Sequence, residues 1–103
     1  METREYPNFA SAMRAALDWL AQNGVKVLDA PFRSKMGTYG MQSKDKRSYY
    51  RIEFDQRSGA HINVQAKGKK GPHFVFDGNE SEVRSRWRQL FLWHPVFGKS
   101  GRG

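Results

Sequence analysis

The chain has 103 residues, which is enough for one small domain with a single hydrophobic core. It contains no cysteine, which excludes disulfides and thiolate metal sites, and no apolar stretch approaches the roughly 18 residues of a membrane span. Eighteen lysines and arginines against ten aspartates and glutamates give a net charge of +8, so we expect a polyanionic partner, with nucleic acid foremost. The opening sequence METREYPNF does not have the pattern of a signal peptide.

The first element predicted along the chain is a helix. Asn8 is a favourable N-cap residue, and Gly24 directly after Asn23 is typical of a helix C-terminus. Apolar residues recur between them at helical spacing, on a stripe that we expect to cover the core: Phe9, Met13, Ala16, Leu17 and Leu20.

The segment after this helix has weaker patterns. Residues 25–28 are predicted as a short strand. Residues 29–47 contain scattered glycines and basic residues, which predicts a long loop with one further short strand at residues 38–42.

From residue 48 the sequence alternates between apolar and polar residues, which predicts three strands: SYYRIEFD, HINVQAK and HFVFD (residues 48–55, 61–67 and 73–77). The intervening stretches QRSG and GKKG resemble turns, so we expect an antiparallel meander. Alternation places the apolar side chains on one face of this sheet and the polar side chains on the other.

The last predicted element is a second helix. Asn79 and Glu82 have the spacing of a capping box, Pro95 ends the helix, and its apolar stripe consists of Val83, Trp87, Leu90 and Phe91. We therefore predict an α+β fold with an N-terminal helix, an antiparallel sheet of three to four strands, and a C-terminal helix packed on one sheet face. Residues 1–95 are expected to form a single domain and residues 96–103 a flexible basic tail.

The expected register decides which polar residues are neighbours. If Asp55 lies opposite His61 and Lys67 lies opposite Gly71, one row across the polar face is Arg51, Gln65 and His73, and another is Asp55, His61 and Asp77. In that register the two histidines lie at opposite ends of their hairpin.

Such a face suits cleavage of RNA without a metal, which requires a general base, a general acid and a cation that stabilises the phosphorus oxygens. Histidine and glutamate suit the first two roles, and the planar fork of arginine suits the third. We predict a catalytic set of Arg51, Glu53, His61 and His73, with no metal and no cofactor. The residues predicted to bind nucleic acid are Tyr49, Asn63, Gln65, Lys67, Lys69, Lys70, Arg84 and Arg88.

The motifs RSGAHINV and KGPHFVFDGNES resemble those of the C-terminal toxin domains of bacterial polymorphic and contact-dependent inhibition systems. More broadly, the layout resembles the metal-independent ribonuclease fold shared by barnase, EndoU, colicin E5, colicin D and RelE. Arg51, His61 and His73 match by type and position. The resemblance implies cleavage of tRNA or rRNA to 2′,3′-cyclic phosphate ends and an acidic immunity protein that blocks the basic face. It also implies action in the cytoplasm after delivery from another cell within a larger secreted protein.

Three other interpretations stay open at this point. The same face is also suited to a nucleic-acid-binding module without catalysis, in which the histidines are incidental. A metal-dependent nuclease is weakly indicated by Asp55 followed by Gln65 and Lys67, although divalent ions prefer clustered carboxylates. Finally, His61 can be an ordinary surface histidine paired with a carboxylate such as Asp55 or Asp77.

Overall fold

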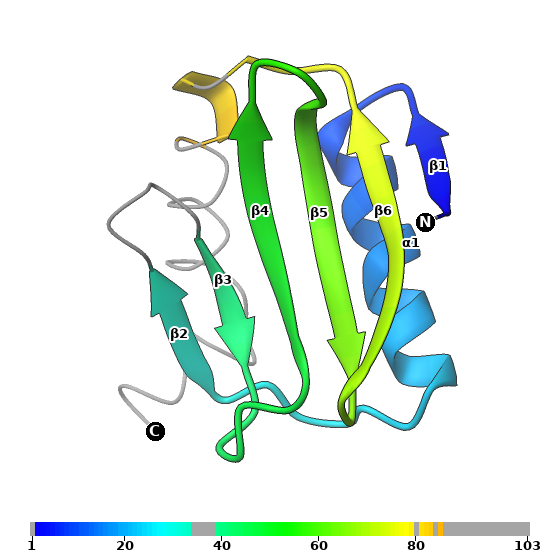
Figure 1. Ribbon diagram of the computed structural model, residues 1–103, viewed down its shortest axis with the longest axis vertical. Helices are drawn as coiled ribbons and strands as arrows, with labels where there is room; N and C mark the ends of the chain where they lie inside the picture. Colours follow the sequence, from blue (N-terminus) through cyan, green and yellow to red (C-terminus); the bar gives the residue numbers. More distant parts are fainter. Residues whose placement is uncertain (1, 34–38, 80, 84, 86–103) are drawn as a thin grey trace.

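The structure is a computed structural model that describes residues 2–33, 39–79, 81–83 and 85. Its centre is one six-stranded sheet with the strand order β1-β6-β5-β4-β3-β2, and one helix packs on it (Figure 1). Neighbouring strands are antiparallel except for β1 and β6, which run parallel. The elements are β1 (Thr3–Tyr6), α1 (Phe9–Gln22), β2 (Ala30–Arg33), β3 (Tyr39–Gln42), β4 (Tyr49–Asp55), β5 (Gly59–Ala66) and β6 (Lys69–Phe76).

The predicted N-terminal helix is confirmed as α1. The Asn8 side chain accepts a hydrogen bond from the backbone N–H of Ser11 at 2.9 Å, which caps the first turn. Gly24 follows the last turn with a φ of +87°, a left-handed conformation that glycine adopts without strain. The helix lies behind β5, β6 and β1 in Figure 1, and its buried residues face the sheet: Ala12, Met13, Ala16 and Leu20.

The predicted alternation of the central strands is also confirmed. The side chains of β4, β5 and β6 that face α1 and the rest of the core are buried: Tyr50, Ile52, Ile62, Val64, Phe74 and Phe76. The residues between them point to the opposite face, which no helix of the described residues covers (Figure 1). This polar face therefore carries the side chains that the sequence singles out.

The prediction of three to four strands is too low, because both edges of the sheet were missed or misplaced. β1 has the sequence TREY, and three of its four residues are exposed, so it shows no apolar alternation. It pairs with β6 through a contact between distant parts of the chain, with Thr3 opposite His73. At the other edge, residues 25–28 form no strand and β2 begins at Ala30, whereas β3 lies within one residue of its predicted position.

The predicted register is wrong by two residues in the β4–β5 hairpin and in the part of the β5–β6 hairpin from Ala60 to Asn63, and by three residues at Gln65, next to the β5–β6 turn. Asp55 lies opposite Gly59 rather than His61, because the connecting loop has three residues, 56–58. The second turn consists of Lys67 and Gly68, both in the left-handed conformation, instead of the stretch GKKG. A shift of two residues keeps a side chain on its predicted face but changes its neighbours.

A β-bulge in β6 makes this register compatible with the alternation. Asn63 lies opposite His73 and Gln65 lies opposite Lys70, so Gly71 and Pro72 together face the single residue Val64. Proline has no backbone N–H to donate, which suits a bulge. A Cβ atom on Gly71 would lie 2.6 Å from the Trp19 ring, so glycine allows α1 to pack closely here.

The predicted capping pair of Asn79 and Glu82 is formed, but most of the predicted C-terminal helix lies outside the described residues, so that helix stays a prediction. The backbone N–H of Asn79 donates to Glu82 at 3.0 Å, and the N–H of Glu82 donates to Asn79 at 2.9 Å. Val83 then enters the core. The rest of the predicted apolar stripe, two predicted nucleic-acid-binding residues and the predicted tail lie outside the described part: Trp87, Leu90, Phe91, Arg84, Arg88 and residues 96–103. Within that part, no helix is long and apolar enough to cross a membrane.

Candidate functional site

The polar face brings three of the four predicted catalytic residues into one cluster on β4, β5 and β6. Glu53 lies opposite His61, and Asn63 lies between Arg51 and His73 in the next row. The rings of His61 and His73 stack with their centroids 5.2 Å apart and an angle of 17° between their planes. The expectation that the two histidines lie at opposite ends of their hairpin is therefore wrong, because it depended on the incorrect register.

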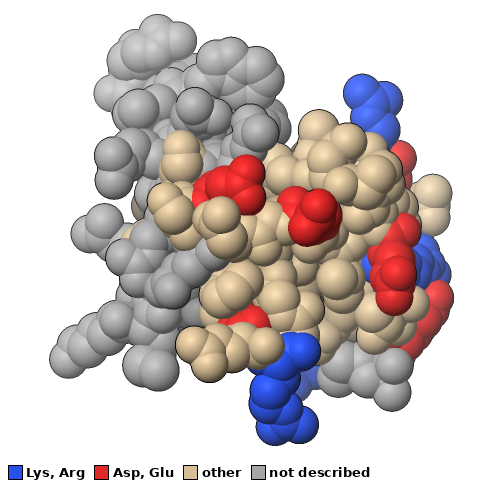
Figure 2. Space-filling view, turned by 90° about the horizontal axis from the view of Figure 1, so that it is seen from above, with Lys and Arg blue, Asp and Glu red and all other residues tan. Residues whose placement is uncertain are grey.

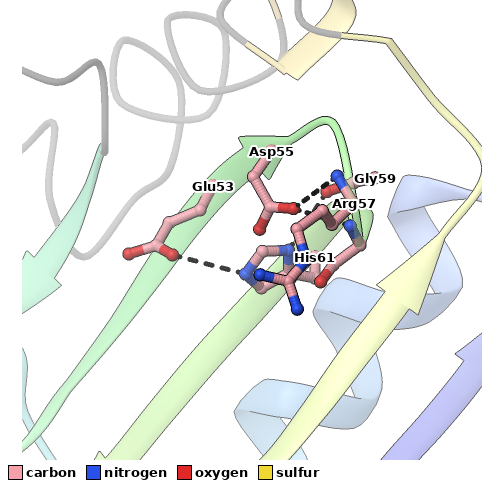
Figure 3. Close-up of polar contacts among 6 residues, drawn as sticks. Glu53, Asp55, Arg57, Gly59 and His61 are labelled. Atoms are coloured by element: carbon pink, nitrogen blue, oxygen red, sulfur yellow. Dashed lines mark hydrogen bonds and ion pairs between the residues drawn. The ribbon is translucent and has the colours of Figure 1, made fainter.

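His61 is held by contacts on both ring nitrogens, and Figure 3 shows the one with Glu53. Its Nε2 lies 3.3 Å from Oε1 of Glu53, and its Nδ1 lies 3.1 Å from the carbonyl oxygen of Gly59. Only 3% of the residue is exposed, whereas the Glu53 side chain is partly accessible. A ring whose two nitrogens both face acceptors is best satisfied as the doubly protonated imidazolium.

The electrostatics of this pair agree with a charged ring. Burial lowers the pKa of His61, but hydrogen bonds to Glu53 and to the Gly59 carbonyl outweigh it, so the pKa is raised above its ordinary value. The hydrogen bond from His61 in turn lowers the pKa of Glu53, although burial opposes this effect. Both shifts favour the ion pair of an ionised carboxylate and a protonated imidazole.

His73 has the opposite electrostatic environment. Burial lowers its pKa, and the positive charge on the stacked His61 lowers it further. The residue is more exposed than His61, and its backbone N–H donates to the carbonyl of Glu2 at 2.9 Å, just before β1. The stacked rings thus favour different protonation states, with His73 neutral and His61 charged.

Arg51 lies beside this cluster and over an aromatic ring. Its guanidinium carbon is 4.1 Å from the centroid of the Tyr49 ring, which is a cation–π distance. The Tyr49 hydroxyl donates to Gln65 at 3.2 Å, and the Gln65 amide donates to the carbonyl of Arg47 at 3.0 Å. Tyr49 is 9% exposed, so its ring supports Arg51 and offers little area to a base.

Asn63 occupies the centre of the cluster, between Arg51 and His73. Its side-chain oxygen is buried and has no hydrogen-bond partner among the described residues. A hydrogen bond with Asn63 also contributes to the lowered pKa of Glu53, after the contribution of His61. An unsatisfied amide oxygen is a favourable acceptor for a hydroxyl or amide donor from a ligand.

Asp55 does not take part in the cluster. Its carboxylate accepts hydrogen bonds from the backbone N–H groups of Ser58 and Arg57 at 2.6 and 2.9 Å, and so closes the β4–β5 turn. The predicted row of Asp55, His61 and Asp77 is not formed, because Glu53 and Val75 are the neighbours of His61. Within the described part, no three histidine, aspartate or glutamate residues are placed to hold a metal ion.

The remaining predicted nucleic-acid-binding residues that the structure describes lie at the far end of the β5–β6 hairpin. Lys67, Lys69 and Lys70 are exposed there. Arg47, which was not predicted as a site residue, joins this end of the sheet through hydrogen bonds with Lys67 and Gly68.

The sequence signal for the correct register of β4 and β5 was Gly59. A three-residue hairpin loop is typically closed by a left-handed glycine, and the φ of Gly59 is +73°.

Comparison with known proteins adds no assignment to this geometry. No protein-family model matches the chain, and a search of curated proteins found no significant match.

Proposed function

We propose that the chain is a metal-independent endoribonuclease that acts on structured RNA such as tRNA or rRNA, in the manner of a bacterial toxin domain. The observation that supports this proposal is the pair of stacked histidines whose pKa values are shifted in opposite directions. Two titratable groups whose environments separate their pKa values are what a general acid and a general base require.

His73 is the proposed general base, because its lowered pKa keeps it neutral and able to accept the proton of the RNA 2′-hydroxyl. The 2′-oxygen attacks the adjacent phosphorus and the bond from phosphorus to the 5′-oxygen breaks. The products are a 2′,3′-cyclic phosphate and a free 5′-hydroxyl. Arg51 is the proposed electrostatic group that stabilises the charge developing on the phosphorus oxygens.

The Glu53–His61 pair is the proposed source of the proton for the departing 5′-oxygen. His61 is buried and both of its nitrogens are engaged, so its proton reaches the substrate through the partly exposed carboxylate of Glu53. Asn63 is proposed to orient the phosphate or a ribose hydroxyl, since its buried oxygen has no partner in the described part of the chain.

The experiment is incubation of the protein with total cellular RNA in excess EDTA, followed by mapping of the cleaved ends. Cleavage with 2′,3′-cyclic phosphate ends supports the proposal. Intact RNA with tight, salt-sensitive binding indicates a binding module instead, and cleavage that is lost on chelation indicates a metal-dependent nuclease. An acidic immunity protein, action in the cytoplasm and delivery within a larger protein stay predictions from the resemblance.

A further inference from the structure

One end of the sheet gathers exposed basic side chains from two turns that are distant in sequence. We call it the basic end and define it by six residues of the β3–β4 connection and the β5–β6 turn: Lys44, Lys46, Arg47, Lys67, Lys69 and Lys70. The one acidic residue among these segments is Asp45, which leaves an excess of five positive charges (six minus one).

Asp45 uses its carboxylate for hydrogen bonds within its own turn and is not placed to pair with the lysines. Its Oδ1 accepts a hydrogen bond from the Ser43 hydroxyl at 2.6 Å and from the backbone N–H of Arg47 at 3.0 Å. The Ser43 hydroxyl, followed by the Arg47 N–H, lowers the pKa of Asp45, so the carboxylate stays ionised while it holds the turn.

Hydrogen bonds link the β3–β4 connection to the β5–β6 turn. Arg47 donates from its guanidinium to the carbonyl of Lys67 at 2.8 Å, and the N–H of Gly68 donates to the carbonyl of Arg47 at 2.8 Å. The N–H of Lys67 donates to the Ser48 hydroxyl, also at 2.8 Å. Because the turns are joined to each other, the backbone positions from which the basic side chains extend are held together.

Two lysines of the basic end adopt a backbone conformation that lysine does not favour. Lys46 has a φ of 64° and Lys67 a φ of 51°, in the left-handed region where glycine, asparagine and aspartate are more favourable. Lys67 has a structural role, since a Cβ atom on Gly24 would lie 3.0 Å from its Nζ, which places the ammonium at the C-terminal end of α1. The backbone N–H of Lys46 donates to the carbonyl of Ser43 at 2.9 Å, and the exposed side chain adds a positive charge to the basic end.

Among the described residues, the other end of the sheet is more acidic than basic. Asp55, Asp77 and Glu82 lie at or near the ends of β4 and β6, whereas Arg57 lies in the β4–β5 turn. Figure 2 looks onto this end and shows acidic side chains spread across it, with lysine and arginine only near the margins. The charges of the described residues therefore favour an RNA backbone that runs from the cluster toward the basic end.

We propose that the basic end is a second phosphate-binding subsite, which holds the RNA backbone several nucleotides away from the bond that is cut. This inference rests on the proposed ribonuclease function. Ala66, next to the β5–β6 turn, is five residues from His61 along β5, or about 16 Å at roughly 3.3 Å per residue. That distance corresponds to about five phosphates, since successive phosphates of one strand are spaced at roughly 3.4 Å along the helix axis. The preferred substrate is therefore a folded RNA whose stem extends from the cluster to the basic end, and a dinucleotide reaches only the cluster.

The test uses a labelled RNA stem-loop with 2′-O-methyl groups at every position, which has no 2′-hydroxyl and is not cleaved. Binding is measured between 50 and 300 mM salt (on the order of the range in which phosphate contacts weaken) for the wild type, Lys46→Asn and Lys69→Gln/Lys70→Gln. Arg14→Gln on the exposed face of α1 is the control, since it removes one charge away from the basic end. We expect a loss of affinity of about 3- to 10-fold for each lysine, and a salt slope smaller by about 0.7 to 0.9 for each lysine removed. Binding by the lysine variants that equals binding by Arg14→Gln would overturn the subsite.

The same variants are then assayed with a cleavable stem-loop and with a dinucleotide. On the stem-loop, we expect the lysine variants to have a higher KM and an unchanged kcat. On the dinucleotide, we expect them to keep the wild-type kcat/KM. If the wild type cleaves neither substrate but the lysine variants still weaken binding, the proposed ribonuclease function fails and the subsite stands. If the wild type cleaves both and the lysine variants cleave both equally well, the subsite fails and the ribonuclease function stands.

Discussion

Near the β4–β5 turn, His61 contacts both Glu53 and His73, and all three residues are partly or fully buried, whereas the cations of the basic end are exposed and spread over two turns. In the first region, contact and burial shift pKa values, because a neighbouring charge acts at short range and water is excluded. In the second region the charges are solvated, so they act through their summed field and are screened by salt. The comparison separates two properties that a ribonuclease needs: protonation states tuned for chemistry, and attraction for a polyanion.

The largest expected effect is on chemistry, from loss of the neutral histidine. His73→Ala should lower kcat on RNA by about 10²- to 10⁴-fold, since that is the usual contribution of a general base. The fold should persist, because His73 lies on the polar face of the sheet and is only partly buried. Turnover and thermal unfolding measure the two properties, and Arg14→Gln is the control for a surface change. Activity within threefold of the wild type would show that His73 is not the base.

The next effect concerns pH, and its sign follows from the two shifts. The pKa of His73 is lowered below its ordinary value of 6.5. The proposed base therefore loses its proton and becomes active as pH rises through this lowered pKa. The pKa of His61 is raised above 6.5, so the proposed acid is lost as pH rises further. A plot of kcat/KM against pH should be bell-shaped, with its maximum near the ordinary histidine value and limbs of about tenfold per pH unit. His61→Gln should remove the falling limb, and a falling limb that is unchanged in this variant would contradict the assignment.

A smaller effect concerns stability at the same cluster. His61→Gln leaves the Glu53 carboxylate without its charged partner, which should lower the free energy of unfolding by about 1–3 kcal/mol. The raised pKa of His61 means that its contribution is complete below about pH 6.5 and is lost as pH rises through the folded-state value. The lowered pKa of Glu53 means that its contribution is present above about pH 4.5 and is lost as pH falls through the folded-state value.

The stability difference between wild type and His61→Gln should therefore be largest between about pH 4.5 and 6.5 and should shrink toward alkaline pH. Urea unfolding at several pH values measures this difference. Glu53→Gln and the double variant complete a mutant cycle that isolates the pair. A difference that does not change with pH would mean that the ion pair contributes nothing and that only packing was lost.

The smallest effect is a gain in stability at the basic end. Lys46→Asn should raise the free energy of unfolding by up to about 1 kcal/mol, because asparagine tolerates the left-handed backbone at this position better than lysine. Thermal or urea unfolding measures the change, and Lys44→Asn in the same exposed turn is the matched control. A stability equal to that of Lys44→Asn would remove the argument that Lys46 is strained.

Much of the local structure follows from short stretches of sequence. Asn8 and Gly24 mark the limits of α1, and Asn79 with Glu82 marks the start of the next helical turn. β1 could not be recognised in the same way, because its residues are polar and its pairing partner, β6, lies some 70 residues later in the chain. A strand at the edge of a sheet needs no apolar side chain to be stable when its backbone hydrogen bonds are formed with its neighbour.

The face on which each side chain of β4, β5 and β6 lies was determined by sequence alternation alone, because successive residues of any strand point to opposite sides. That is why Arg51, His61 and His73 share one surface despite the wrong register. Which of them touch was decided only by the tertiary structure, since register belongs to two strands together and depends on the turn and the bulge that join them. The contact of His61 with Glu53 on one side and His73 on the other is therefore a property of the folded sheet, and it sets both histidine pKa values.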